Sequence, residues 1–175
     1  MRRGGQEPAV ASGLTQIWTR WSRYGTDGAM NDAQSLIDKL GLAPHPEGGW
    51  YRETWRAPER VGDRAIATAI LFLLEEGQRS HWHRVDATEI WLWHSGSPLT
   101  LLTAPGDDGP IDTYRLGGNP LAGEIPQHVI APGDWQATEA RDGWGLVSCI
   151  VAPGFQFEGF TLAPPDWSPG DQAKR

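Results

Sequence analysis

The chain has 175 residues, enough for one domain with a single hydrophobic core. Its 22 glycines and 14 prolines favour the many tight turns of an all-β domain. A formal net charge of −7 and the lack of a basic run in the sequence exclude nucleic acid and anionic membrane surfaces from the expected partners.

The first predicted element is a short helix that follows Met30. Asn31 is a residue type that caps helix N-termini, and Gly41 is the expected end of the helix. Between them, apolar residues recur at helical spacing, at Ala33, Leu36, Ile37 and Leu40. Residues 1–29, rich in Gly, Ser, Thr and Arg, are expected to form a poorly ordered N-terminal extension.

From Trp50 onward the sequence predicts β-strands separated by turns. The expected strands are residues 64–74, 80–84, 88–94, 98–104, 111–116, 125–131, 135–140, 144–152 and 155–162. The segment Gly106-Asp107-Asp108-Gly109 predicts a hairpin, and two Pro-Gly pairs predict further turns. The turn spacing is typical of an all-β sandwich or small barrel, here residues 30–163, and residues 164–175 are expected to be a C-terminal tail.

Two features indicate the compartment. The longest apolar run, residues 65–74, is half the length that a membrane helix needs, and no apolar core follows the arginines at the start of the chain. The single cysteine, Cys149, excludes an internal disulfide, and its apolar surroundings predict a buried, inert thiol. We therefore expect a cytoplasmic protein.

His81 and His83 lie on one predicted strand. Because side chains alternate along a strand, both imidazoles are expected on one face, about 6–7 Å apart. Glu89 begins the next strand, and a hairpin would return its carboxylate to the histidines. Such a set suits a divalent metal, namely iron, manganese, nickel or zinc, and histidines of an ordinary core or pocket are the alternative.

The segment His45-Pro46-Glu47-Gly48-Gly49 is a second candidate for the site. Its two glycines permit a tight turn or a close approach of the backbone to a ligand. A structural turn and a pocket role for His45 and Glu47 are equally compatible with this pattern. Tyr51 follows on a predicted strand and is a candidate acid.

Two further side chains are candidates for substrate binding. Arg84 is able to bind an anionic substrate, although an exposed arginine with solvent partners is the commoner case. Trp91 shares a strand face with Glu89 and Trp93 by alternation, and it forms either a stacking wall in a cavity or part of the core.

The spacing of these residues resembles the first motif of the cupin superfamily. The matching positions are Gly77, His81, His83, Glu89 and Gly96. A second motif would run from Gly123 to Gln136, and Gln136 stands where the superfamily has its last histidine ligand. A neutral amide oxygen is a poorer ligand than an imidazole for a borderline metal.

Other blocks of the sequence resemble cupin family 5, catalogued as a domain of unknown function. They are His45-Pro46-Glu47-Gly48-Gly49, Tyr51-Arg52-Glu53, Thr68-Ala69-Ile70, Trp82-His83-Arg84, Glu89-Ile90-Trp91, Leu116-Gly117, Pro132-Gly133 with Trp135-Gln136, and Val151-Ala152-Pro153-Gly154-Phe155. The resemblance implies a double-stranded β-helix (jelly-roll) barrel with a short N-terminal helix, commonly paired as a homodimer. It implies no particular reaction, and it implies that His83 is the kept histidine whereas position 81 varies.

The sequence thus indicates a cupin that binds a small molecule and has no nucleotide cofactor. One catalytic form holds a metal through His81, His83, Glu89 and Gln136. The other is metal-free, with His83 as base and Tyr51 or Glu89 as acid for proton transfer beside a carbonyl, similar in fold to the sugar-nucleotide epimerases of the superfamily. The expected substrate-binding residues are His45, Glu47, Arg84, Trp91 and Gln136. The alternative to both forms is a non-catalytic ligand-binding or sensing cupin.

Overall fold

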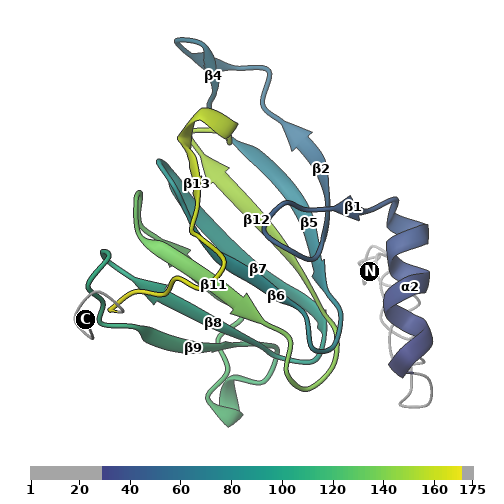
Figure 1. The fold of residues 1–175 in the computed structure, drawn as a ribbon. Coiled ribbons are helices and arrows are strands. Elements are labelled where there is room, and N and C mark those ends of the chain that lie inside the picture. The colour runs from purple at the N-terminus through teal and green to yellow at the C-terminus, as the bar shows by residue number, and fades with distance from the viewer. Residues whose placement is uncertain (1–28, 171–175) are drawn as a thin grey trace, which may run out of the picture.

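The computed structural model describes residues 29–170, in which one helix precedes two facing antiparallel β-sheets (Figure 1). Except for its last residue, the extension predicted over residues 1–29 lies outside the described residues. Within residues 29–170, no helix has the length and apolar character that crossing a bilayer requires.

Helix α2 (Ala29–Leu40) covers the outer face of the larger sheet. It begins two residues before Asn31 and ends as predicted at Gly41, whose φ of 63° is a conformation that glycine adopts without strain. The apolar stripe buries Ala33 and Ile37 against Leu73 of the sheet. Helical spacing in the sequence therefore identified the buried side of the helix.

The larger sheet contains six strands. In order across the sheet they are β1 (Ala43–Pro44), β2 (Trp50–Arg56), β5 (Thr68–Leu74), β12 (Gly145–Ala152), β7 (Thr88–Gly96) and β10 (Gln127–Ile130). The neighbouring strands are antiparallel, so alternate side chains face the second sheet.

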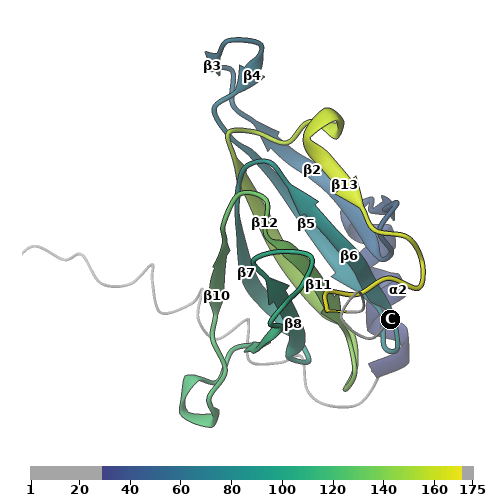
Figure 2. The same cartoon turned by 60° about the vertical axis from the view of Figure 1, so that its left-hand side comes forward.

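The smaller sheet contains five strands and faces the larger one (Figure 1). Its order is β13 (Phe160–Leu162), β6 (Arg79–Val85), β11 (Trp135–Glu139), β8 (Leu99–Ala104) and β9 (Asp112–Leu116). A separate hairpin of β3 (Arg60–Val61) and β4 (Arg64–Ala65) projects beyond the two sheets (Figure 2). Two 3-10 turns complete the described fold, η2 (Pro120–Ala122) and η3 (Phe157–Gly159).

The all-β jelly-roll fold with a short N-terminal helix, predicted from the turn spacing and the resemblance, is confirmed. The predicted hairpin around residues 106–109 is also confirmed, since β8 pairs with β9 from Leu99↔Leu116 onward. The predicted strand 64–74 is divided into β4 and β5, and only the last three residues of the predicted strand 155–162 are extended as β13. The hairpin expected between residues 80–84 and 88–94 is wrong, because β6 and β7 belong to opposite sheets.

The core lies between the two sheets. Trp91 and Phe72 of the larger sheet pack edge-to-face with ring centroids 5.8 Å apart, and Leu99 and Leu101 approach them from the smaller sheet. Cys149 is buried in the same cluster, as its apolar surroundings predicted. The core fills one end of the space between the sheets, and the other end holds a cavity.

The outer face of the smaller sheet is covered by residues 163–170, which we call the C-terminal strap. Ala163 N donates a hydrogen bond to Trp82 O at 2.9 Å, and Gly170 N donates one to Asp107 O at 2.8 Å. Between these points Trp167 packs against Trp135, with ring centroids 4.4 Å apart and the ring planes tilted by 45°. Most of the strap belongs to the segment expected to be a tail, and it is packed against the sheet.

Candidate functional site

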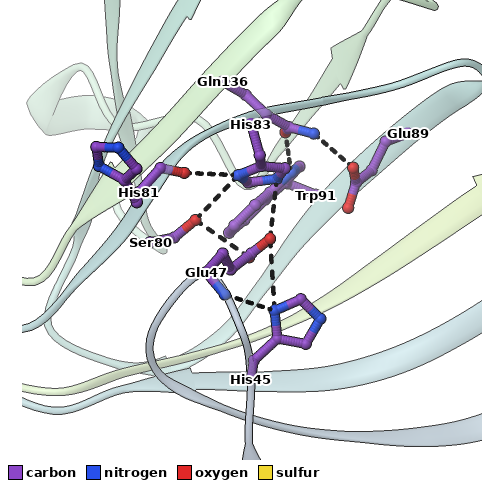
Figure 3. Close-up of polar contacts among 8 residues, drawn as sticks. All are labelled: His45, Glu47, Ser80, His81, His83, Glu89, Trp91 and Gln136. Atoms are coloured by element: carbon purple, nitrogen blue, oxygen red, sulfur yellow. Dashed lines mark hydrogen bonds and ion pairs between the residues drawn. The ribbon is translucent and has the colours of Figure 1, made fainter. Parts of the chain in front are cut away.

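A cavity of about 350 Å³ opens between the two sheets. Its inner wall includes the side chains of His45, Glu47, His83 and Glu89. Its outer part is lined by Glu53, Arg56 and the segment around η3. The cavity thus brings together residues of β2, β5, β6, β7 and β12 and the loop of residues 45–49. Figure 3 shows His83, Glu89 and the side chains of this loop.

A β-bulge in β6 decides which histidine faces this cavity. Gln136 of β11 is paired with His83, whereas Thr138 is paired with Ser80, so two residues of β6 stand opposite one residue of β11. Ser80 and His83 consequently both point inward and are fully buried. His81 lies on the other side, with Nε2 2.8 Å from Pro164 O of the strap.

The prediction that His81 and His83 share one face is therefore wrong. Strict alternation assumes an unbroken pleat, and the extra residue of the bulge shifts the phase of every side chain beyond it.

The hydrogen bonds of His83 define its tautomer. Nδ1 lies 2.8 Å from the carbonyl oxygen of His81, so it carries the proton and donates it to that acceptor. The unprotonated Nε2 then faces Glu47 Oε2 at a distance of 3.2 Å. Burial lowers the pKa of His83, which keeps the imidazole neutral and available as a base.

Glu47 reaches His83 from a tight loop that is anchored on the bulge. His81 N donates a hydrogen bond to Glu47 O at 2.7 Å, and Ser80 Oγ donates one to Glu47 Oε1 at 3.1 Å. Gly48 is required for this approach, since it has a φ of 108° and a Cβ there would lie 2.2 Å from Arg79 O.

Burial raises the pKa of Glu47 to about 8. Near neutral pH the carboxyl group therefore keeps its proton, and Oε2 donates it to Nε2 of His83.

His45 forms the side of the cavity next to this pair. Its Nδ1 lies 3.5 Å from Glu47 Oε2, and its ring packs edge-to-face on Tyr51 with centroids 4.5 Å apart. Burial, together with the neighbouring His83, lowers the pKa of His45 to about 4. His45 is thus a neutral wall residue, and the structure places Tyr51 in the cavity beside it.

Glu89 enters the cavity from β7 and is held by a chain of hydrogen bonds (Figure 3). Trp91 Nε1 donates to Gln136 Oε1 at 2.8 Å, and Gln136 Nε2 donates to Glu89 Oε2 at 2.6 Å. Burial raises the pKa of Glu89. Trp91 and Gln136, both predicted to contact substrate, lie behind Glu89 and do not line the cavity.

The residues predicted to bind a metal do not form a convergent donor set. His81 points away from the cavity, Nε2 of His83 faces Glu47, and the amide oxygen of Gln136 already accepts from Trp91. Across residues 29–170, no three His, Cys, Asp or Glu side chains are arranged to hold a metal ion. The predicted set of ligands therefore does not fit a metal.

Arg84 also lies outside the cavity. Its guanidinium sits 4.6 Å above the centroid of the Trp135 ring, and Nη1 lies 3.7 Å from Asp107 Oδ1. The side chain belongs to the outer face of the smaller sheet, beside the C-terminal strap.

Sequence reasoning missed the aromatic mouth of the cavity. Phe155, Phe157 and Phe160 line it and contact one another edge-to-face, with centroid distances of 5.1, 5.8 and 6.3 Å. Three aromatic residues within six positions are the available signal, although strand-like composition alone predicts only a strand over residues 155–162. Among residues 29–170 no tryptophan lines the cavity, and Trp91 and Trp93 belong to the core, the alternative to a stacking wall. The phenylalanines provide the aromatic part of the wall.

Comparisons with known proteins identify a family and two similar proteins. The family model described as "Cupin superfamily (DUF985)" matches residues 34–163. The solved structure of protein SO0799 from Shewanella oneidensis is 38% identical and has a TM-score of 0.72, covering 77% of this chain and 85% of that chain. The uncharacterized protein YML079W of Saccharomyces cerevisiae is 28% identical, covering 74% of each chain.

A more distant likeness concerns the fold alone. Oxalate decarboxylase from Bacillus subtilis is 13% identical with a TM-score of 0.53, covering 68% of this chain and 29% of that chain. The two facing sheets, the cavity between them and the match over residues 34–163 lead to one assignment: the chain belongs to the cupin superfamily, in the family known as DUF985.

Proposed function

We propose that this cupin binds a small carbonyl compound in its cavity and transfers a proton on the carbon next to the carbonyl group, with His83 as base and Glu47 as acid. The observation that carries the proposal is the 3.2 Å contact between His83 Nε2 and Glu47 Oε2 on the wall of the cavity. Both side chains are more than nine-tenths buried, and both are held in the neutral form that such a pair requires.

His83 and Glu47 together supply and take up every proton that this reaction moves. Nε2 of His83 removes the proton from carbon while the Oε2 hydroxyl of Glu47 gives its proton to the carbonyl oxygen. The substrate becomes an enol, and the protein is left with an imidazolium facing a carboxylate. Return of a proton to carbon from His83 and of the enol proton to Glu47 restores both groups. An isomer results if the proton reaches a different carbon or the opposite face.

The surroundings support these two roles. His81 O holds Nδ1–H of His83, so the lone pair of the base is on Nε2, on the side of the ring that faces Glu47. Ser80 Oγ donates to the second oxygen of Glu47 and thereby turns the other oxygen to His83. Glu47 replaces Tyr51 and Glu89 as the proposed acid, because it is the carboxyl group in direct contact with the base.

Solvent exchange tests the proposal without knowledge of the natural substrate. A panel of small ketones, aldoses and keto acids is incubated with the protein in D₂O, and deuterium on carbon is followed by proton NMR. We expect protein-dependent exchange in at least one compound and its loss in His83→Gln. If every compound that binds exchanges at the uncatalysed rate, the proton transfer is disproved.

One observation favours a second candidate, a non-catalytic binding protein. The contact between Glu47 and His83 also ties the loop of residues 45–49 to β6, so the pair has a structural use that needs no substrate. Ligand binding detected by NMR line broadening, without deuterium incorporation, would support this candidate over the enzyme.

A further inference from the structure

We infer that the cavity selects an organic cation, a small amine whose ammonium group lies between Glu89 and the phenylalanines of the mouth. The inference rests on the proposed binding of a small molecule in this cavity, but it does not depend on the proton transfer. It concerns the charge of the ligand, which the contact between Glu47 and His83 does not determine.

The carboxyl groups of the lining favour a cation. Four carboxyl groups line the cavity, those of Glu47, Glu53, Glu89 and Glu158, against the single guanidinium of Arg56. Arg56 is already occupied: Nε and Nη2 contact the two oxygens of Glu53 at 3.0 and 2.7 Å, and Nη1 donates to Phe155 O at 3.3 Å. An anionic ligand would therefore meet no unpaired positive group of the lining, whereas a cation would meet the carboxyl groups of Glu89 and Glu158.

Glu89 is the carboxyl group best placed to receive the ammonium. It lines the cavity although its side chain is only 6% exposed, and Gln136 donates to Oε2 alone. Its other close polar neighbours are the thiol of Cys149 and the neutral side chains of His83 and Glu47. No arginine or lysine among residues 32–170 forms an ion pair with it. A buried carboxyl group without a cation is costly to ionise, and an ammonium ligand supplies the missing charge.

The mouth supplies a second feature that favours a cation. Phe155, Phe157 and Phe160 surround it, and Phe157 is 60% exposed although it is a large apolar side chain. The faces of aromatic rings carry partial negative charge and attract ammonium groups, whereas they repel carboxylates. An exposed phenylalanine at the entrance is therefore placed to contact the ligand.

Three probes with the same ring test the charge preference: benzylamine, benzyl alcohol and benzoate. Their affinities are measured at neutral pH by isothermal titration or by ligand-observed NMR. We expect benzylamine to bind at least about tenfold more tightly than the other two, the size of one ion pair or of a cation–π contact in a desolvated site.

Matched variants locate the effect. In Glu89→Gln the amide oxygen still accepts from Gln136, so the fold is kept while the charge is lost, and benzylamine should lose its advantage over benzyl alcohol. Phe157→Ala should weaken benzylamine more than benzoate. Glu76→Gln makes the same chemical change on an exposed loop, and it should leave all three affinities unchanged.

The outcomes separate this inference from the proposed reaction. Benzoate binding as tightly as benzylamine, no binding of benzylamine, or an unchanged preference in Glu89→Gln would overturn the cation site. His81→Gln, at a histidine outside the cavity, should bind benzylamine with wild-type affinity. An amine preference without deuterium exchange would therefore support this inference while contradicting the proposed catalysis.

Discussion

The two faces of strand β6 carry the same kind of residue in different surroundings. On the inner face, His83 is buried among Glu47, Ser80 and the cavity. On the outer face, His81 binds the backbone of the C-terminal strap through Nε2 and contacts Arg79 through Nδ1. The inner imidazole meets a carboxyl group that shares its proton, whereas the outer one meets a carbonyl that only accepts. The hydrogen-bond partner, and not the residue type, makes His83 a candidate base and His81 a structural residue.

The largest expected effect comes from exchanging one histidine at a time. His83→Gln removes the base, so deuterium exchange should fall by about 100-fold or more. His81→Gln keeps a donor for Pro164 O and should retain the wild-type exchange rate. The rates are measured by NMR on the compound that exchanges fastest, after thermal unfolding has shown that both variants are folded. Equal losses in the two variants would place the base elsewhere.

The comparison also shows what the sequence was able to predict. Turn spacing, helical periodicity and the motif blocks identified the fold, because these patterns are local. The bulge that separates His81 from His83 left no sign in the residues, and the sheet to which a strand belongs depends on partners distant in the chain. Glu89 does face His83 as expected, but it does so across the space between the sheets and not through a hairpin.

The sequence predicted some of the residues that line the cavity and not others, for a physical reason. His45, Glu47, Tyr51 and His83 line the cavity. Arg84, Trp91 and Gln136 do not, since side-chain direction depends on strand phase and on which face is covered. The contact between Glu47 and His83 joins a loop to a distant strand, and no pattern of spacing encodes that proximity.

Glu47→Gln tests the proposed acid on the inner face of β6. The amide can donate to His83 Nε2 and accept from Ser80 Oγ, so the geometry is kept while the acid is lost. Deuterium exchange should therefore fall by about 100-fold.

The stability of this variant should also change with pH in a defined direction. The folded-state pKa of Glu47, about 8, lies above the ordinary value of 4.5. Its contribution to wild-type stability is thus complete below pH 4.5 and is lost as the pH rises through 8. Relative to wild type, Glu47→Gln should gain unfolding free energy by up to about 1.4 kcal/mol per pH unit within that window. Denaturant titrations at several pH values measure this slope, and a flat difference would contradict the raised pKa.

Trp167→Ala tests the outer face. The variant removes the ring contact with Trp135 and exposes the outer surface of β11, so the unfolding free energy should fall by about 2 kcal/mol. The C-terminal strap does not line the cavity, and the affinity for benzylamine should stay at the wild-type value. Urea denaturation and titration of the same preparation give both quantities. A large loss of affinity would mean that the strap supports the cavity wall through β6.

The smallest expected effect is an increase in the unfolding free energy, and it concerns Thr138, the residue paired with Ser80 across the bulge. Ser80 Oγ donates to Glu47, whereas Thr138 Oγ1 is buried and has no hydrogen-bond partner within the described part of the chain. Thr138→Val keeps the shape of the side chain and removes the unsatisfied hydroxyl, so the unfolding free energy should rise by about 1 kcal/mol. Urea denaturation checks this value, and a decrease would mean that the hydroxyl is hydrogen-bonded in solution. The bulge would then have a satisfied polar group on both strands, and the difference between Ser80 and Thr138 would disappear.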